Sequence, residues 1–99
     1  MNLDISVDRR PTTTVVTLTG ELDLASATRL EHELDGLTAD DLVLDMREVT
    51  YLDSTGVSLL LRRDAAARTL GRRLRIIGGA ATRRVFALTQ VDRLLQLAG

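Results

Sequence analysis

Two hydrophobic periodicities alternate along the 99 residues of this chain, and the alternation limits the folds that it can adopt. Short segments with an apolar residue at every second position predict strands, and longer segments with spacings of three and four predict helices. Such alternation is typical of a largely parallel sheet, because the helices supply the crossovers between parallel strands. We therefore predict a single α/β domain over residues 1–99, with helices packed on a mixed, largely parallel sheet of four to five strands.

The first half of the chain predicts two strands, a helix and a third strand. Leu3, Ile5 and Val7 alternate with polar residues, and the break at residues 9–11 is short enough for this strand to pair antiparallel with a second one at residues 12–22. A third strand at residues 42–46 is nearly all apolar; we expect Asp45 at its end and a turn at residues 47–48. The helix before it has an apolar stripe of Ala27, Leu30, Leu34 and Leu37.

The second half predicts a long helix at residues 54–70, a strand at residues 74–77 and a third helix that Thr82 can cap. Gly71 is placed to end the long helix in a left-handed conformation. Leu59 falls off the inner stripe of this helix, so we expect it to be exposed and to contact a partner. The inner stripe of the long helix consists of Val57, Leu60, Leu61, Ala65 and Leu70. The third helix carries Val85, Phe86, Leu88 and Thr89. A short fifth strand would lie near Val91, Leu94, Leu95 and Leu97.

The stretch at residues 49–61 carries the strongest functional signal. A short extended run ends at Asp53, and either Asp53 or Ser54 can cap the helix that follows. Thr55 then lies in the first turn, so two hydroxyl groups sit at the positive end of a helix. A phosphate there would add about −1.5 to −2 charges at pH 7, which the helix start would tolerate. Capping alone is the commoner role of such residues.

A second candidate residue stands at the end of the second strand. The string Gly20-Glu21-Leu22-Asp23 closes that strand, and Asp23 or Ser26 can cap the next helix. Functional groups in open α/β sheets collect at the carboxyl ends of the strands, just before the helices. Asp23 and the segment at residues 53–55 both have that placement, so a role in a site and a role as a cap remain open for Asp23.

Composition excludes several classes of function. A net charge of −1 argues against electrostatic capture of nucleic acid. The chain has no cysteine, which excludes disulfides and thiolate chemistry. No apolar stretch approaches the roughly 18 residues that span a membrane, and the N-terminus has no signal-peptide pattern, so we expect a cytoplasmic protein that does not bind a membrane.

An enzyme is the weaker alternative. His32, the only histidine, lies mid-helix between two glutamates with no motif around it. Asp45 and Asp53 flank the predicted turn and could hold Mg²⁺, but no further ligand string or phosphate loop accompanies them. The pair Gly78-Gly79 lacks the remainder of a nucleotide fingerprint and favours a turn. We expect no catalytic residues, no metal and no cofactor.

The string Tyr51-Leu52-Asp53-Ser54-Thr55-Gly56-Val57 resembles the phosphorylation motif of anti-sigma factor antagonists in the STAS family. Gly20-Glu21-Leu22-Asp23 and the string Arg-Arg-Val-Phe-Ala-Leu-Thr at residues 83–89 resemble further segments of that family, so the resemblance covers nearly the whole chain. It implies an α/β STAS fold and a phosphorylation-controlled binding protein rather than an enzyme.

The resemblance also implies the site and its partners. Thr55 would be the phosphoacceptor, with Ser54 as the next candidate. The partners would be an anti-sigma factor with Ser/Thr kinase activity and a Ser/Thr phosphatase. An alternative within the family is a structural subunit of a larger assembly, such as a lipid-transport ATPase complex or a signalling scaffold. The predicted partner-binding residues are Asp23, Asp53, Ser54, Thr55, Gly56 and Leu59.

Overall fold

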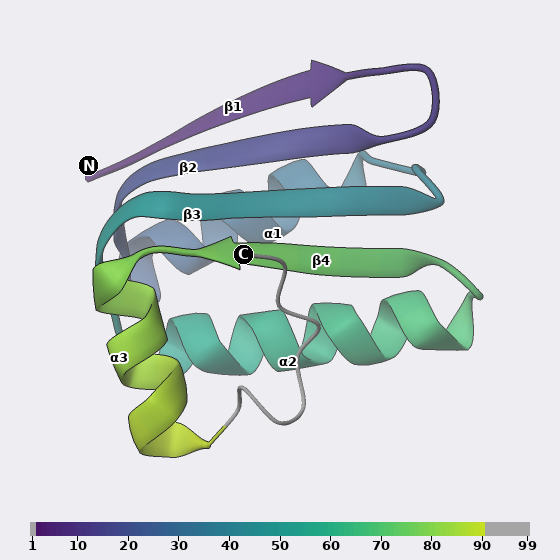
Figure 1. Ribbon diagram of the computed structural model, residues 1–99. Coiled ribbons are helices and arrows are strands. Elements are labelled where there is room, and N and C mark those ends of the chain that lie inside the picture. The colour runs from purple at the N-terminus through teal and green to yellow at the C-terminus, as the bar shows by residue number, and fades with distance from the viewer. Residues whose placement is uncertain (1, 91–99) are drawn as a thin grey trace.

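The structure is a computed structural model that describes residues 2–90. A four-stranded sheet lies over three helices (Figure 1). The elements in chain order are β1 (Leu3–Arg9), β2 (Thr14–Leu22), α1 (Leu24–Asp35), β3 (Asp41–Leu52), α2 (Ser54–Thr69), β4 (Arg73–Gly78) and α3 (Ala80–Thr89). The predicted fifth strand lies outside the described residues, as do Val91, Leu94, Leu95 and Leu97.

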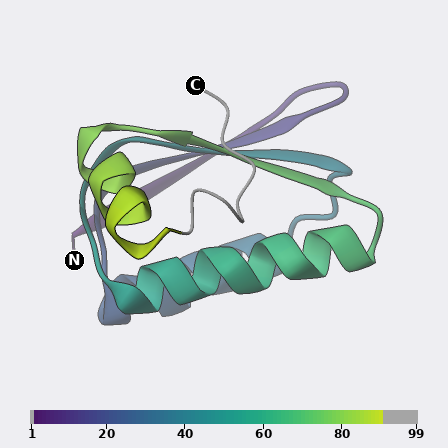
Figure 2. The same ribbon diagram turned by 60° about the horizontal axis from the view of Figure 1, so that its bottom comes forward.

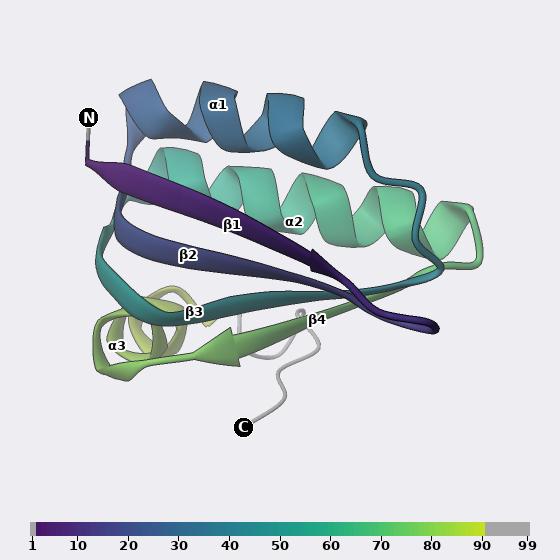
Figure 3. The ribbon, with the colours of Figure 1, turned by 90° about the horizontal axis from the view of Figure 1, so that it is seen from above.

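The strands lie in the order β1-β2-β3-β4. β1 pairs antiparallel with β2, whereas β2 with β3 and β3 with β4 pair parallel, which confirms the predicted mixed, largely parallel sheet. β3 lies beside β2, and β4 lies beside β3 on the side away from β2. Because both crossovers move across the sheet in the same direction and are right-handed, both connecting helices lie on the same face. Figures 2 and 3 show α1 and α2 side by side beneath that face, each running back from the carboxyl ends of the parallel strands.

The core lies between this face and the helices. Every second residue of β2 points inward, so Val16 and Leu18 are fully buried while Val15 and Thr17 are only half-buried on the opposite face. The helices contribute apolar side chains to the same layer, among them Leu30, Leu34, Leu60 and Phe86. None of the helices in residues 2–90 is long and apolar enough to cross a bilayer.

β3 corrects the sequence prediction at its centre. Instead of turning at residues 47–48, it continues to Leu52 and pairs with β2 along its length. Two β-bulges allow the pairing to continue. β3 has one residue more than the facing stretch of β2 between Asp45 and Glu48, and again between Val49 and Tyr51. The polar pair that suggested a turn lies exposed on this bulged strand. Asp45 consequently lies within the strand rather than at its end.

α2 matches its predicted bounds, and Gly71 follows it with a left-handed φ of 68°, as expected. The prediction that Leu59 is exposed is wrong, because its exposed fraction is 0%. Leu59 stands three and four residues before Arg62 and Arg63, which contact α1, so it lies on the side of α2 that faces α1. Ala65 and Leu70 are exposed, although the stripe placed them inside.

α3 begins differently from the prediction. Gly79 is the N-cap, and Thr82 lies in the first turn, where its buried hydroxyl accepts a hydrogen bond from the Gly79 amide at 2.9 Å. Phe86 is buried as expected, whereas Leu88 is exposed. A side chain on Gly79 would meet the backbone of Arg47, with an added Cβ only 2.4 Å from the Arg47 carbonyl oxygen, so glycine lets α3 start against β3.

Candidate functional site

The first part of the candidate site is the start of α1. Asp23 follows directly after β2 and caps the helix, accepting a hydrogen bond from the Ser26 amide at 3.0 Å. The Ser26 hydroxyl accepts from the Asp23 amide at 3.0 Å and donates to the Glu21 carbonyl at 2.7 Å, which completes a capping box. The Ser26 hydroxyl also lies 3.0 Å from Asp23 Oδ1, an alternative acceptor for its one proton. The hydrogen bond from the Ser26 amide, followed by the one available from this hydroxyl, lowers the pKa of the Asp23 carboxyl. Asp23 is therefore both a cap and a fixed negative charge.

The second part is the start of α2. Asp53 caps this helix by accepting a hydrogen bond from the Gly56 amide at 3.1 Å, and its carbonyl accepts the first helical bond, from Val57, at 3.0 Å. Ser54 and Thr55 are the first two helical residues, so they lie where backbone N–H groups point out of the helix. This arrangement makes Asp53 the cap, one of the two candidates that the sequence left open.

The fold brings these two helix starts together. Leu22 and Leu52 are paired across the parallel strands β2 and β3, so Asp23 and Asp53 follow at neighbouring strand ends. The Asp53 amide donates to the Leu22 carbonyl at 3.4 Å, which ties one loop to the other. Figure 3 shows both helices starting at the same edge of the sheet.

The two hydroxyl groups of this edge differ in exposure. Ser54 is exposed and Thr55 is half-buried. Within residues 2–90, neither hydroxyl makes a side-chain hydrogen bond, unlike the hydroxyl of Ser26. Both oxygen atoms therefore keep their donor and acceptor capacity for an incoming group.

Gly56 and Leu59 are not surface residues. Gly56 is buried, and a Cβ added to it would lie 2.5 Å from Leu52 Cδ1 and 3.1 Å from the Leu22 carbonyl oxygen. The glycine thus lets the start of α2 pack tightly on the ends of both strands. Packing against the sheet and against α1 buries Gly56 and Leu59, so the exposure on which the predicted partner contact of Leu59 depended is absent.

The exposed apolar side chains at this edge are Leu24 and Tyr51, neither of which the sequence singled out as a contact. Leu24 is 71% exposed and immediately follows Asp23; Tyr51 lies two residues before Asp53 and is half exposed. Leu24 is the first residue of α1 and lies beyond the end of β2, so the sheet does not cover it. Recognising Asp23 as the N-cap would have identified Leu24 as the exposed first residue of the helix.

The carboxylate pair Asp45 and Asp53, considered above as a Mg²⁺ site, makes contacts within the protein instead. Asp45 is buried and binds Arg47 through two side-chain contacts, of 3.0 and 2.7 Å. The hydrogen bonds from the Arg47 side chain lower the pKa of the Asp45 carboxyl. His32 is exposed on α1, and no group of three potential metal-ligating side chains forms within the described part of the chain.

Comparison with known families agrees with this geometry. The family model described as "Mlab, STAS domain" matches residues 5–96. The chain belongs to the STAS domain family. The anti-sigma-F factor antagonist RsfB of Mycobacterium tuberculosis is 30% identical over 89 residues, which span 84% of the STAS chain and 70% of RsfB.

Solved structures resemble the STAS chain over nearly its full length. An anti-sigma factor antagonist from Mycobacterium paratuberculosis superposes with a TM-score of 0.81 at 27% identity, covering 96% of this chain and 84% of the other. The Bacillus cell fate determinant SpoIIAA in its phosphorylated form gives a TM-score of 0.74 at 20% identity, with coverages of 97% and 92%. At that identity, the likeness to SpoIIAA shows the fold alone.

Proposed function

We propose that this STAS protein is an anti-sigma factor antagonist, a regulatory binding protein whose attachment to an anti-sigma factor is controlled by phosphorylation of Thr55. The observation that carries the proposal is the meeting of two capped helix starts at neighbouring strand ends, one of which presents unbonded hydroxyls. The names of the relatives supply the partner class: RsfB and the M. paratuberculosis protein are both anti-sigma factor antagonists.

The unmodified binding surface combines charge with apolar area. Asp23 and Asp53 contribute carboxylates, Ser54 and Thr55 contribute hydroxyls, and Leu24 contributes an exposed aliphatic side chain. A partner surface with hydrogen-bond donors around an apolar pocket fits these groups. Binding of this surface to an anti-sigma factor would release the sigma factor.

Phosphorylation would reverse the binding. An anti-sigma factor with Ser/Thr kinase activity transfers the γ-phosphoryl group of ATP to Thr55 Oγ1, which loses its proton, and ADP leaves. The product carries about −1.5 to −2 extra charges two residues from Asp53. The positive end of α2 accommodates this charge, so the domain stays folded. The partner surface, which faced a neutral hydroxyl, then meets a dianion beside two carboxylates and dissociates.

The remaining parts of the proposal follow from this role. A Ser/Thr phosphatase resets the switch by hydrolysing the phosphate ester. The protein itself catalyses no reaction and binds no cofactor, nucleic acid or membrane. It works in the cytoplasm, where sigma factors and RNA polymerase meet.

The test is to incubate the purified protein with ATP and the candidate anti-sigma factor kinases. The proposal predicts a mass gain of about 80 Da, the mass of one phosphoryl group, mapped to Thr55 by peptide sequencing. Thr55→Ala should abolish the gain and retain binding, whereas Ser54→Ala should change neither. Modification of Thr55→Ala at Ser54 would show that the acceptor is wrong.

A structural subunit of a larger assembly is the second candidate. The matched family is defined by its domain and named "Mlab", without reference to an anti-sigma factor. Stable co-purification with a transporter ATPase, together with no mass gain under any kinase, would favour this role. The two free hydroxyls beside Asp53 favour the antagonist.

A further inference from the structure

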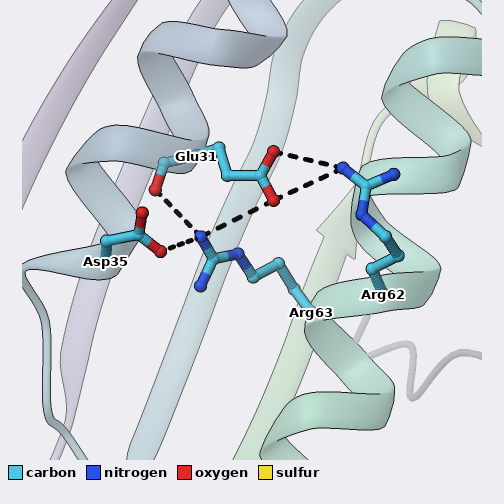
Figure 4. A network of polar contacts seen from close by, with 4 residues as sticks. All are labelled: Glu31, Asp35, Arg62 and Arg63. Atoms are coloured by element: carbon cyan, nitrogen blue, oxygen red, sulfur yellow. Dashed lines mark hydrogen bonds and ion pairs between the residues drawn. The ribbon is translucent and has the colours of Figure 1, made fainter.

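A four-residue ion-pair network joins α1 to α2 (Figure 4). Arg62 contacts both carboxylate oxygens of Glu31 at 3.1 and 3.3 Å. Arg63 donates to the Glu31 backbone carbonyl at 2.9 Å and to the Asp35 carboxylate, and lies 3.7 Å from the Glu31 carboxylate. We refer to Glu31, Asp35, Arg62 and Arg63 as the helix clamp.

The geometry of the clamp fixes how α1 lies against α2. The apolar contacts of α1, through buried Ala27, Leu30 and Leu34, are non-directional. The hydrogen bond from Arg63 to a backbone carbonyl is directional and holds the helix itself rather than a mobile side chain. Arg63 Nε is buried without a partner among the described residues, an unfavourable arrangement that the other contacts of the guanidinium must offset.

The clamp lies at a similar distance from both helix starts. Glu31 is eight residues from Asp23, and Arg62 is nine residues from Asp53, so about 12–14 Å of helix separates the clamp from each cap. α1 and α2 run in the same direction, and the clamp therefore sets which turns lie side by side. At the site end, a backbone hydrogen bond of 3.4 Å from Asp53 to Leu22 ties the two loops, and Leu24 projects into solvent.

We infer that Arg63 is a positioning residue for the partner-binding edge, holding Asp23 and Leu24 on α1 in register with Thr55 on α2. This inference rests on the proposed function for its binding consequence, but its structural consequence stands without it. Loss of the Arg63 contacts lets α1 tilt against α2 about its capped start, where Asp23 links it directly to β2, while the buried leucines keep the domain folded. The first turn of α1, with Leu24 on it, then adopts several orientations relative to α2, and a partner binds only one of them.

The structural test uses the ¹⁵N-labelled full chain and its amide spectrum. Arg63→Gln should shift or broaden the amide signals of residues 23–25, about 12 Å of helix away. Arg72→Gln is the matched control, since Arg72 is also a partly exposed arginine with one aspartate partner, Asp40, on the far side from the site. Unchanged signals of residues 23–25 in Arg63→Gln would overturn the inference, whatever the function.

The binding test uses the anti-sigma factor that the wild-type protein binds, at a temperature where circular dichroism shows every variant fully folded. Arg63→Gln should raise Kd by about 3- to 30-fold, the range of coupling through packed elements. Arg63→Lys should recover part of the loss by keeping one donor, and Arg72→Gln should bind normally. Equal affinity of wild type and Arg63→Gln would contradict the inference. Absence of any wild-type complex would instead contradict the proposed function.

Discussion

Replacement of Gly56 by alanine tests whether the start of α2 is packed as tightly as the site requires. Gly56 is the third residue of α2, and its φ is not in the left-handed region, so alanine meets no backbone strain there. The obstacle is space. An added Cβ would lie 2.5 Å from Leu52 Cδ1, 3.0 Å from Leu22 Cγ and 3.1 Å from the Leu22 carbonyl oxygen.

The three contacts are unequal, and this sets the magnitude. The end of the Leu52 side chain can rotate away, but Leu22 Cγ and the Leu22 backbone belong to the fully buried end of β2. Overpacking of this kind costs about 1–3 kcal/mol, and the better helix propensity of alanine returns up to about 1 kcal/mol. The net loss should be about 1–2 kcal/mol, which lowers Tm by about 5–15 °C in a domain of this size.

Thermal unfolding followed by circular dichroism measures the loss, with Gly36→Ala as the control. The nearest atom to a Cβ on Gly36 is 3.6 Å away, so that variant should be neutral or more stable by up to about 1 kcal/mol. If Gly56→Ala matched Gly36→Ala in Tm, the close packing of α2 on β2 and β3 would be refuted. The position of Thr55 at the start of α2 would then also be wrong.

Three further predictions concern the same molecule. Leu59→Ala should cost about 2–5 kcal/mol in urea unfolding, whereas Leu24→Ala should change stability by less than about 0.5 kcal/mol and weaken the complex with the anti-sigma factor; the reverse pattern would contradict the assigned burial. Asp45→Asn should cost about 1 kcal/mol at pH 7, because the charge-assisted contacts between the buried Asp45 and the largely exposed Arg47 side chain are lost. Folding lowers the pKa of Asp45, so its contribution to the free energy of unfolding is complete above roughly pH 4, the pKa of the unfolded state. That contribution disappears as the pH falls through the lower pKa of the folded state. Wild type and variant should therefore have the same stability in acid and differ at higher pH. Asp53→Asn keeps an equally good cap and should leave Tm unchanged, but the phosphorylated form should bind about five-fold more tightly than phosphorylated wild type in a titration, because one repulsive charge is gone; equal affinities would show that Asp53 does not oppose the phosphate.

Local pattern predicted the architecture because each element carried its own signal. The period of two in β2 and the caps at Asp23 and Asp53 depend on residues within a few positions, and these short-range signals are enough to place both site loops at strand ends. Parallel pairing then followed from the alternation of elements.

The failures share a physical cause, which is contact between segments distant in sequence. Leu59 is buried because α1 packs on a second side of α2, and a single helical stripe does not contain that information. Residues 47–48 remain in β3 because β2 continues to pair with it across two bulges.

Control of binding by phosphorylation is measured by the affinity of the anti-sigma factor for this protein with and without phosphate on Thr55. The phosphorylated and unmodified forms, separated after the kinase reaction, would be titrated against the same partner by calorimetry at physiological salt. Phosphate at Thr55 should raise Kd by at least about 100-fold, if phosphorylation controls binding. Equal affinity of the two forms would contradict it.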